Sequence, residues 1–221
     1  PDIVVRVTNE TGHKLPTGYP EGRRMWLNVR FYDMNDQVIE EHGAYDNSTA
    51  VLSTDDTTVF EAKMGLDDYM ANQTGLPAGE SFHFVLNNTF VKDNRIPPRG
   101  YEIASFEHAG AQPHDIVYDQ SQYWHDSVFA RPSDAVRAEV RLLYQTTSKE
   151  YIEFLQQHND PNTNRGQTAY DQWVLHGKSE PVVMGRIWTV APVADKAGAY
   201  AATREAPLAF APPPKLKVVQ A

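Results

Sequence analysis

Alternation of apolar residues in two distant segments is the feature that most constrains the fold of this chain. The segments are residues 24–33 and 136–146. The apolar positions of the first fall on one face and are Met25, Leu27, Val29 and Phe31. A period of two is typical of a strand that buries one face. Both segments are therefore predicted to be strands that cover a core.

Further strands are predicted from short runs rich in β-branched and aromatic residues. They are residues 2–8, 38–43, 58–63, 81–90 and 181–192. Late in the chain the period changes, because Thr147-Ser148-Lys149-Glu150 matches a capping box and 166–176 carries an apolar stripe. We therefore expect a mainly β protein, an antiparallel β-sandwich of immunoglobulin-like or fibronectin-III-like architecture, with a helical hairpin at about 148–177.

The organisation along the chain is expected to be simple. A length of 221 residues with 41% hydrophobic residues suits one large domain, which we place at residues 1–193. Residues 194–221 are rich in Ala and Pro and are predicted to form an extended tail. The sequence starts at Pro1, already strand-like and without an initiator Met, as a processed protein or a fragment would, and we favour a fragment.

Composition excludes several classes of function. A net charge of −9 without a Lys/Arg run argues against nucleic-acid binding. No apolar run approaches the roughly 20 residues needed to span a bilayer. The absence of cysteine excludes disulfides, thiolate metal sites and covalent c-type haem attachment within these residues. No nucleophile elbow, zinc-protease motif or phosphate-binding loop occurs, which makes the commonest hydrolase and nucleotide-binding classes less probable.

A loop at residues 11–27 combines prolines, glycines, one histidine and two adjacent arginines between two predicted strands. Pro fixes φ and Gly permits positive φ, so such a loop is suited to holding one shape. Its histidine, His13, fits two interpretations: a structural side chain bonded to a backbone carbonyl, or a metal or haem-iron ligand. Arg23 and Arg24 could bind an internal carboxylate such as Glu21, or an acidic ligand such as a haem propionate.

Three histidines in the 101–134 region, His108, His114 and His125, are candidate metal ligands, although their spacing matches no standard metal motif. Asp115 and Asp126 follow two of them and could orient the imidazoles. The alternative is a solvated loop with scattered histidines. His83, between two phenylalanines, is interpreted as structural. Aspartates near residues 46–56 could bind calcium, although the spacing of an EF-hand is absent.

Five stretches together resemble the haem-free C-terminal β-domain of bacterial multihaem c-type cytochromes. They are TGHKLPTGYPEGRRMWL (11–27), FHFVLNN (82–88), KDNRIPPRG (92–100), YQTTSKEYIEFL (144–155) and SEPVVM (179–184). In that family the CxxCH haem sites lie outside this domain. The resemblance implies electron transfer in the periplasm or at the cell surface, with a haem-bearing segment or subunit and a redox protein as partners. It also implies that His13 reaches a haem iron as the distal axial ligand.

Two other functions stay open. One is a binding or assembly module whose C-terminal tail docks on a neighbouring subunit. The other is a metal-dependent enzyme that uses the histidines at 108–125. Under the first interpretation, haem chemistry belongs to residues outside this sequence, and no catalytic activity is expected within it.

Overall fold

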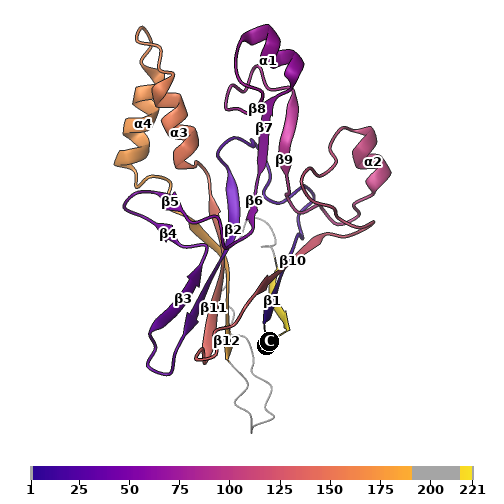
Figure 1. The fold of residues 1–221 in the computed structure, drawn as a ribbon, viewed down its shortest axis with the longest axis vertical. Coiled ribbons are helices and arrows are strands. Elements are labelled where there is room, and N and C mark those ends of the chain that lie inside the picture. The colour runs from indigo at the N-terminus through magenta and orange to yellow at the C-terminus, as the bar shows by residue number, and fades with distance from the viewer. Residues whose placement is uncertain (1, 191–214, 221) are drawn as a thin grey trace.

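The computed structural model describes residues 2–190 and 215–220 and shows a mainly β chain with four helices among these residues (Figure 1). The strands are β1 (Ile3–Thr8), β2 (Arg24–Tyr32), β3 (Val38–His42), β4 (Tyr45–Asp46), β5 (Val51–Leu52), β6 (Val59–Phe60), β7 (Ala62–Leu66), β8 (Gly79–Glu80), β9 (Thr89–Asp93), β10 (Trp124–Phe129), β11 (Arg137–Gln145), β12 (Val182–Val190) and β13 (Lys215–Gln220). The helices are α1 (Asp68–Thr74), α2 (Ile103–His108), α3 (Lys149–Gln157) and α4 (Arg165–Leu175). None of these helices is long and apolar enough to cross a membrane.

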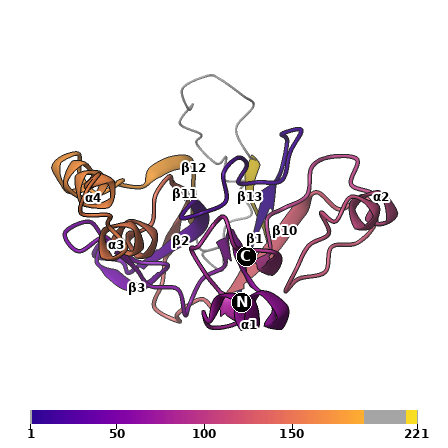
Figure 2. The same ribbon diagram turned by 90° about the horizontal axis from the view of Figure 1, so that it is seen from above.

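Two antiparallel sheets enclose the core, so the predicted β-sandwich is confirmed. One sheet has the order β10-β1-β13 and the other the order β12-β11-β2-β3, with β6 pairing beside β2. A separate sheet has the order β8-β7-β9, and α1 follows β7 in the chain. Seen from above, the α3–α4 hairpin and α2 lie on opposite flanks of these sheets (Figure 2).

The alternation in β2 decides which side chains fill the sandwich. The four predicted core residues are at most 2% exposed and are Met25, Leu27, Val29 and Phe31. They pack with Val5 and Val7 of β1 and with Val140 and Leu142 of β11. Burial of each such side chain contributes roughly 1.5–3 kcal/mol to stability. The opposite face of β2 carries Trp26, which lies in a second cluster with Leu52, Val59 and Leu143.

The helical hairpin forms as expected but begins one residue later than the capping box predicts. The N-cap of α3 is Ser148, not Thr147, and its hydroxyl accepts a hydrogen bond from the backbone N–H of Tyr151. Glu150 is consequently not at the third helical position, where a capping box needs it. Ile152 of α3 and Trp173 of α4 pack around the buried Ala50, which joins the hairpin to the sandwich.

Replacing the cap should weaken the hairpin measurably. We expect Ser148→Ala to lower the free energy of unfolding by about 1 kcal/mol, because it leaves a helix N–H without its acceptor. Thr147→Ala is the matched control and should change that free energy by less than about 0.5 kcal/mol. Urea unfolding measures both variants, and equal losses would contradict the assignment of Ser148 as the cap.

Two segments differ from the sequence-based prediction. Residues 81–88, predicted as part of a strand, form turns with local backbone hydrogen bonds such as Leu86 N–H to His83 C=O, and the strand β9 starts only at Thr89. Within the predicted tail, residues 215–220 form β13, which pairs with β1 and packs Leu216 and Val218 against the core. Residues 194–214 of that tail lie outside the described residues.

Candidate functional site

The loop that carries His13 is fixed by one buried side chain at its start, Asn9. The Asn9 side-chain amide is fully buried and donates to three carbonyls, those of His13 at 2.7 Å, Ile96 at 2.9 Å and Pro97 at 2.9 Å. Its oxygen accepts hydrogen bonds from the backbone N–H and the hydroxyl of Thr11. Asn9 therefore ties both sides of the His13 turn to the segment that follows β9.

A second anchor lies just beyond His13. Leu15 and Ile96 form a two-way backbone bridge with N···O distances of 2.9 and 3.0 Å. Next to it, Lys14 Nζ lies 2.6 Å from the carboxylate of Asp93, which is 1% exposed and also binds Arg95 through two hydrogen bonds. Burial disfavours the Asp93 carboxylate, but Arg95 and Lys14 together hold its pKa below the usual range.

His13 itself is exposed at the surface of this anchored loop. Within the described part of the chain, its imidazole makes no hydrogen bond, ion pair or ring contact. If His13 had a structural role, its ring would be expected to bond to a backbone carbonyl. The Asn9 side chain makes such bonds in this loop instead. The loop thus holds its backbone firmly while leaving both ring nitrogens available.

Arg23 folds back onto its own loop. Its Nη1 donates to the carbonyl of Thr17 at 2.6 Å. Gly18 adopts φ of +88°, and any side chain there would collide with the Arg23 guanidinium. The Arg23 side chain therefore closes the second half of the loop. It lies against residue 18, where the positive φ favours glycine.

Arg24 is buried, at 5% exposure, and lies on the outer face of β2. Its Nε donates to Gln145 at 2.8 Å, its Nη1 lies 3.5 Å from Glu150, and its guanidinium lies 5.8 Å from the ring centroid of Trp26. These contacts connect the loop to the start of α3. In this structure both Arg23 and Arg24 bind groups of their own chain.

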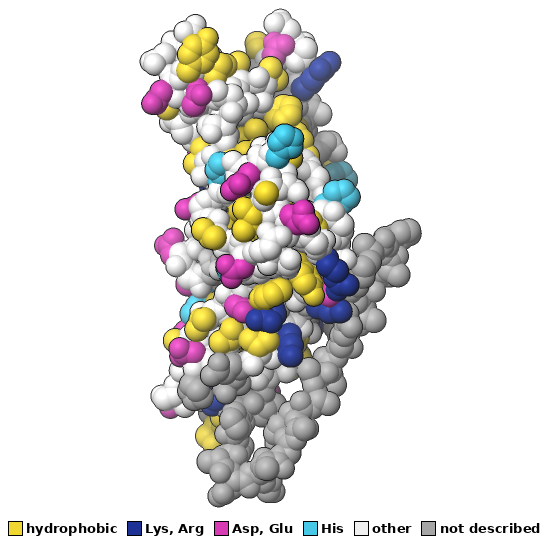
Figure 3. Space-filling model, turned by 90° about the vertical axis from the view of Figure 1, so that its right-hand side faces the viewer, with side chains coloured by type: hydrophobic (Ala, Val, Ile, Leu, Met, Phe, Trp, Pro, Cys, Tyr) yellow, Lys and Arg dark blue, Asp and Glu magenta, His cyan; other side chains and the backbone are white. Residues whose placement is uncertain are grey.

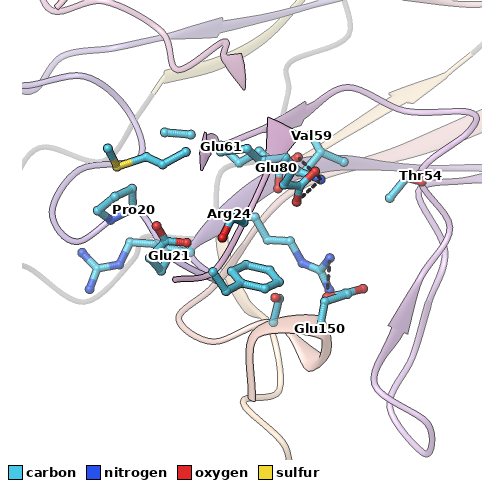
Figure 4. A pocket seen from close by; sticks show the side chains of 16 residues that line it. Pro20, Glu21, Arg24, Thr54, Val59, Glu61, Glu80 and Glu150 are labelled. Atoms are coloured by element: carbon cyan, nitrogen blue, oxygen red, sulfur yellow. Dashed lines mark hydrogen bonds and ion pairs between the residues drawn. The ribbon is translucent and has the colours of Figure 1, made fainter. Parts of the chain in front are cut away.

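A polar pocket of about 210 Å³ lies between this loop, β6–β8 and the start of α3 (Figure 4). Arg24 runs across it toward Glu150, and Glu21 lies at the opposite end. Glu21 is 4% exposed, and its Oε1 has no hydrogen-bond partner among the described residues. Burial raises its pKa to about 7, although Asn87 lowers it in part, and the nearby Glu80 carboxylate adds to the rise.

An aromatic cluster adjoins this pocket. Phe82 contacts Tyr151 and Phe154 of α3 at centroid distances of 5.5 Å, and His83 packs edge-on against Phe154 at 5.0 Å. This arrangement explains why residues 81–88 leave the sheet, since Phe82, half-buried, packs against α3, while Phe84 is 49% exposed and contacts Tyr19 of the loop. It also agrees with the structural interpretation of His83.

The three histidines of the 101–134 region occupy different environments. His108 is exposed at the end of α2, His114 stacks on Phe90 at 5.6 Å, and His125 packs against Phe60 at 5.2 Å. Burial lowers the pKa of His125. On the flank that carries α2 and β10, histidines appear at separate places rather than in one group (Figure 3).

Within residues 2–190 and 215–220, no three His, Cys, Asp or Glu side chains form a group that could hold a metal ion. Metal binding by His108, His114 and His125, and calcium binding near residues 46–56, stay predictions.

The sequence does not reveal two features of the site, the anchoring role of Asn9 and the burial of Glu21. From the sequence, Glu21 is expected as a partner of Arg23 or Arg24, but it pairs with neither among the described residues. Asn9 could be found from its position, since an Asn between a strand and a Gly/Pro-rich loop is typical of an Asx turn. Glu21 has a weaker signal, a lone acid between Pro20 and Gly22. Its burial depends on Phe82 and α3, which are distant in sequence.

Comparison with known proteins gives limited information. No protein-family model matches the chain, and no curated protein matches it. Among solved structures, the chain resembles the penta-heme cytochrome c552 from Thermochromatium tepidum with a TM-score of 0.48 and 17% sequence identity. The match covers 86% of this chain and 35% of that chain, so the sequence spans about a third of the length of the cytochrome. A likeness of this degree assigns neither a family nor a function.

Proposed function

We propose that this chain is a haem-free β-domain of a multihaem c-type cytochrome and that it serves electron transfer in the periplasm or at the cell surface. In this proposal His13 is the distal axial ligand of a haem c carried by residues outside this sequence. The observation that carries the proposal is the exposed imidazole of His13, which has no partner among residues 2–190 and 215–220, on a loop anchored by Asn9. The five stretches that resemble multihaem cytochromes support it.

The residues present fit the role of a ligand donor but not that of a covalent haem attachment site. A neutral imidazole is a common axial ligand of haem iron, and a stiff loop keeps such a ligand in place. The chain has no cysteine, so thioether bonds to a haem would have to come from other residues. Contact between a propionate and Arg23 or Arg24 would require these side chains to leave their present partners, so we assign the interaction to His13 alone.

The contribution of the domain would be positional. The haem, when bound, supplies the electron-transfer chemistry. The loop would hold the His13 imidazole toward the iron, and the surrounding surface would exclude water from that side of the porphyrin. Because the loop is anchored at Asn9 and at Leu15, little conformational entropy would be lost when the imidazole binds.

A haem c peptide that carries its own proximal histidine and an open sixth position tests the proposal directly. We expect the unaltered protein to convert the ferric peptide from high spin to low spin in a saturable titration, followed by absorption and electron paramagnetic resonance. His13→Ala should weaken this conversion sharply, because it removes the imidazole of the anchored loop and leaves exposed histidines only elsewhere, such as His108 and His176. The same variant should change the free energy of unfolding by less than about 0.5 kcal/mol, since the exposed ring makes no hydrogen bond, ion pair or ring contact with the described residues.

His176→Ala is the matched control, because His176 is also exposed but lies after α4. The His176→Ala protein should convert the haem peptide to low spin as the unaltered protein does. A His13→Ala protein that converts the haem peptide as well as the unaltered protein does would refute the assignment.

A further inference from the structure

Three arginines are brought together on the outer face of the larger sheet. They are Arg30 on β2, Arg141 on β11 and Arg186 on β12. The register places Arg141 directly opposite Arg186 in the antiparallel β11–β12 pair. Like charges directly opposite each other destabilise a sheet unless negative groups compensate them.

The nearby carboxylates are distributed unequally among these arginines. Arg30 Nε lies 2.8 Å from Glu41, and Arg186 Nε lies 3.0 Å from Glu139. Among the described residues, Arg141 approaches a carboxylate only at 3.9 Å, at the Glu41 oxygen that is already bonded to Arg30. Burial and the charges of Arg30 and Arg186 lower the pKa of Arg141, against the opposing effects of Glu139 and Glu41.

Asn28 holds the Arg141 guanidinium in one orientation. Its side-chain oxygen accepts from Nε at 3.0 Å and from Nη2 at 2.6 Å of Arg141. The Asn28 amide is itself fixed, because it donates to Glu41 and to the backbone carbonyls of His42 and Gly43. Asn28 is 1% exposed, so this support is buried. A guanidinium held in this way is preorganised to bind a planar anion through its remaining N–H groups.

A pocket of about 180 Å³ opens beside this guanidinium. Arg30, Arg141 and Glu41 line one part of it, and Tyr45 and Glu180 contribute to its wall. The Glu180 carboxylate accepts a hydrogen bond from Asn47 at 3.2 Å, and no cation of the described residues pairs with it. The pocket therefore contains a cation, Arg141, whose charge is only partly compensated, and a carboxylate, Glu180, that has no cationic partner in the part of the chain that the structure describes.

We propose that this pocket binds a small carboxylic acid whose carboxylate pairs with Arg141 and whose second group, an ammonium or a hydroxyl, donates to Glu180. An α-amino or α-hydroxy acid has this chemistry and fits the volume. Glu41 and Glu180 would repel a simple anion, so the donating group is needed for selectivity. The proposal does not depend on haem binding by the His13 loop.

Titration of the ¹⁵N-labelled protein with glycine or acetate tests this site at constant ionic strength. We expect saturable shifts of the Arg141 Nε–H signal with both compounds. Glycine should bind about 3- to 10-fold more tightly, because acetate lacks the donor for Glu180. Glu180→Gln should make the two affinities equal. Equal affinities in the unaltered protein would overturn the role of Glu180, and the absence of a saturable shift with either compound would overturn the site.

Variants of the arginine give the matched comparison, with shifts followed at the backbone amides of Asn28 and Tyr45. Arg141→Gln should abolish binding. Arg141→Lys keeps the positive charge but lacks the paired N–H donors of the guanidinium, and it should weaken binding at least about threefold. Arg137→Gln should leave binding unchanged, because Arg137 lies on the same strand outside the pocket and pairs with Asp36. Circular dichroism checks that each variant is folded. Unaltered binding by a folded Arg141→Gln protein would refute the proposal.

Discussion

Asp93→Ala is expected to lower the free energy of unfolding by about 3–5 kcal/mol, which is the usual cost of leaving buried charges without their partner. The substitution removes a carboxylate that is 1% exposed and leaves the Lys14 ammonium and the Arg95 guanidinium without it. Because Lys14 directly follows His13, the loss should also loosen the His13 loop. Urea unfolding at neutral pH measures the change in stability.

Asp126→Ala provides the control, because it removes an ion pair with Arg6 in which both side chains are about one-third exposed. Such a pair contributes at most about 1 kcal/mol. Since the pKa of Asp93 is lowered in the fold, its contribution is present above the ordinary value of 3.8 and is lost as the pH falls through the lowered pKa. If Asp93→Ala lowered the free energy of unfolding no more than Asp126→Ala does, the ion pairs of Asp93 with Lys14 and Arg95 would not anchor the loop.

Glu21→Gln is expected to stabilise the protein at pH 8 by up to about 3 kcal/mol, since a pKa change of one unit corresponds to about 1.4 kcal/mol. The carboxyl has a pKa of about 7 in the fold against an ordinary value of 4.5. The folded state therefore binds the proton more tightly than the unfolded state, and stability should fall as the pH rises from about 4.5 to about 7. The amide stays neutral throughout, so the variant should lack this decline.

Urea unfolding between pH 4 and pH 8 tests this expectation. At pH 4 the two proteins should be nearly equally stable, and the difference should grow through neutral pH. Glu102→Gln, at an exposed position before α2, should follow the unaltered protein at every pH. A variant at Glu21 that shows the same decline with pH as the unaltered protein would contradict the raised pKa that burial gives to this carboxyl.

The sandwich could be predicted from sequence because its strands follow a simple physical rule. Alternation in residues 24–33 identifies correctly the face of β2 that lines the sandwich core. It does not reveal that the opposite face is buried too, with Trp26 and Asn28 at most 1% exposed. The segment at 81–88 misleads because its aromatic residues are also spaced by two. Phe82 instead contacts Tyr151 and Phe154 on a helix about 70 residues away, and sequence spacing contains no information about that contact.

The candidate site was predictable only in part for the same reason. His13 stands out by its chemistry within a Pro/Gly-rich loop. The groups that fix this loop do not, because Asn9 acts on carbonyls at residues 96 and 97, and Asp93 joins Lys14 to Arg95. The arginine pocket depends on strand register as well, since only the β11–β12 pairing reveals that Arg141 lies opposite Arg186.

The pairing of β13 with β1 has a mechanical consequence. The two strands are antiparallel, and Val4 lies opposite Gln220, so the first and last described residues emerge side by side at one end of the ladder. A tension applied between those two ends would load the hydrogen bonds one after another, as in a zipper, and not all together in shear. This ladder should therefore open at a low force, and β13 should detach before the strands of the larger sheet.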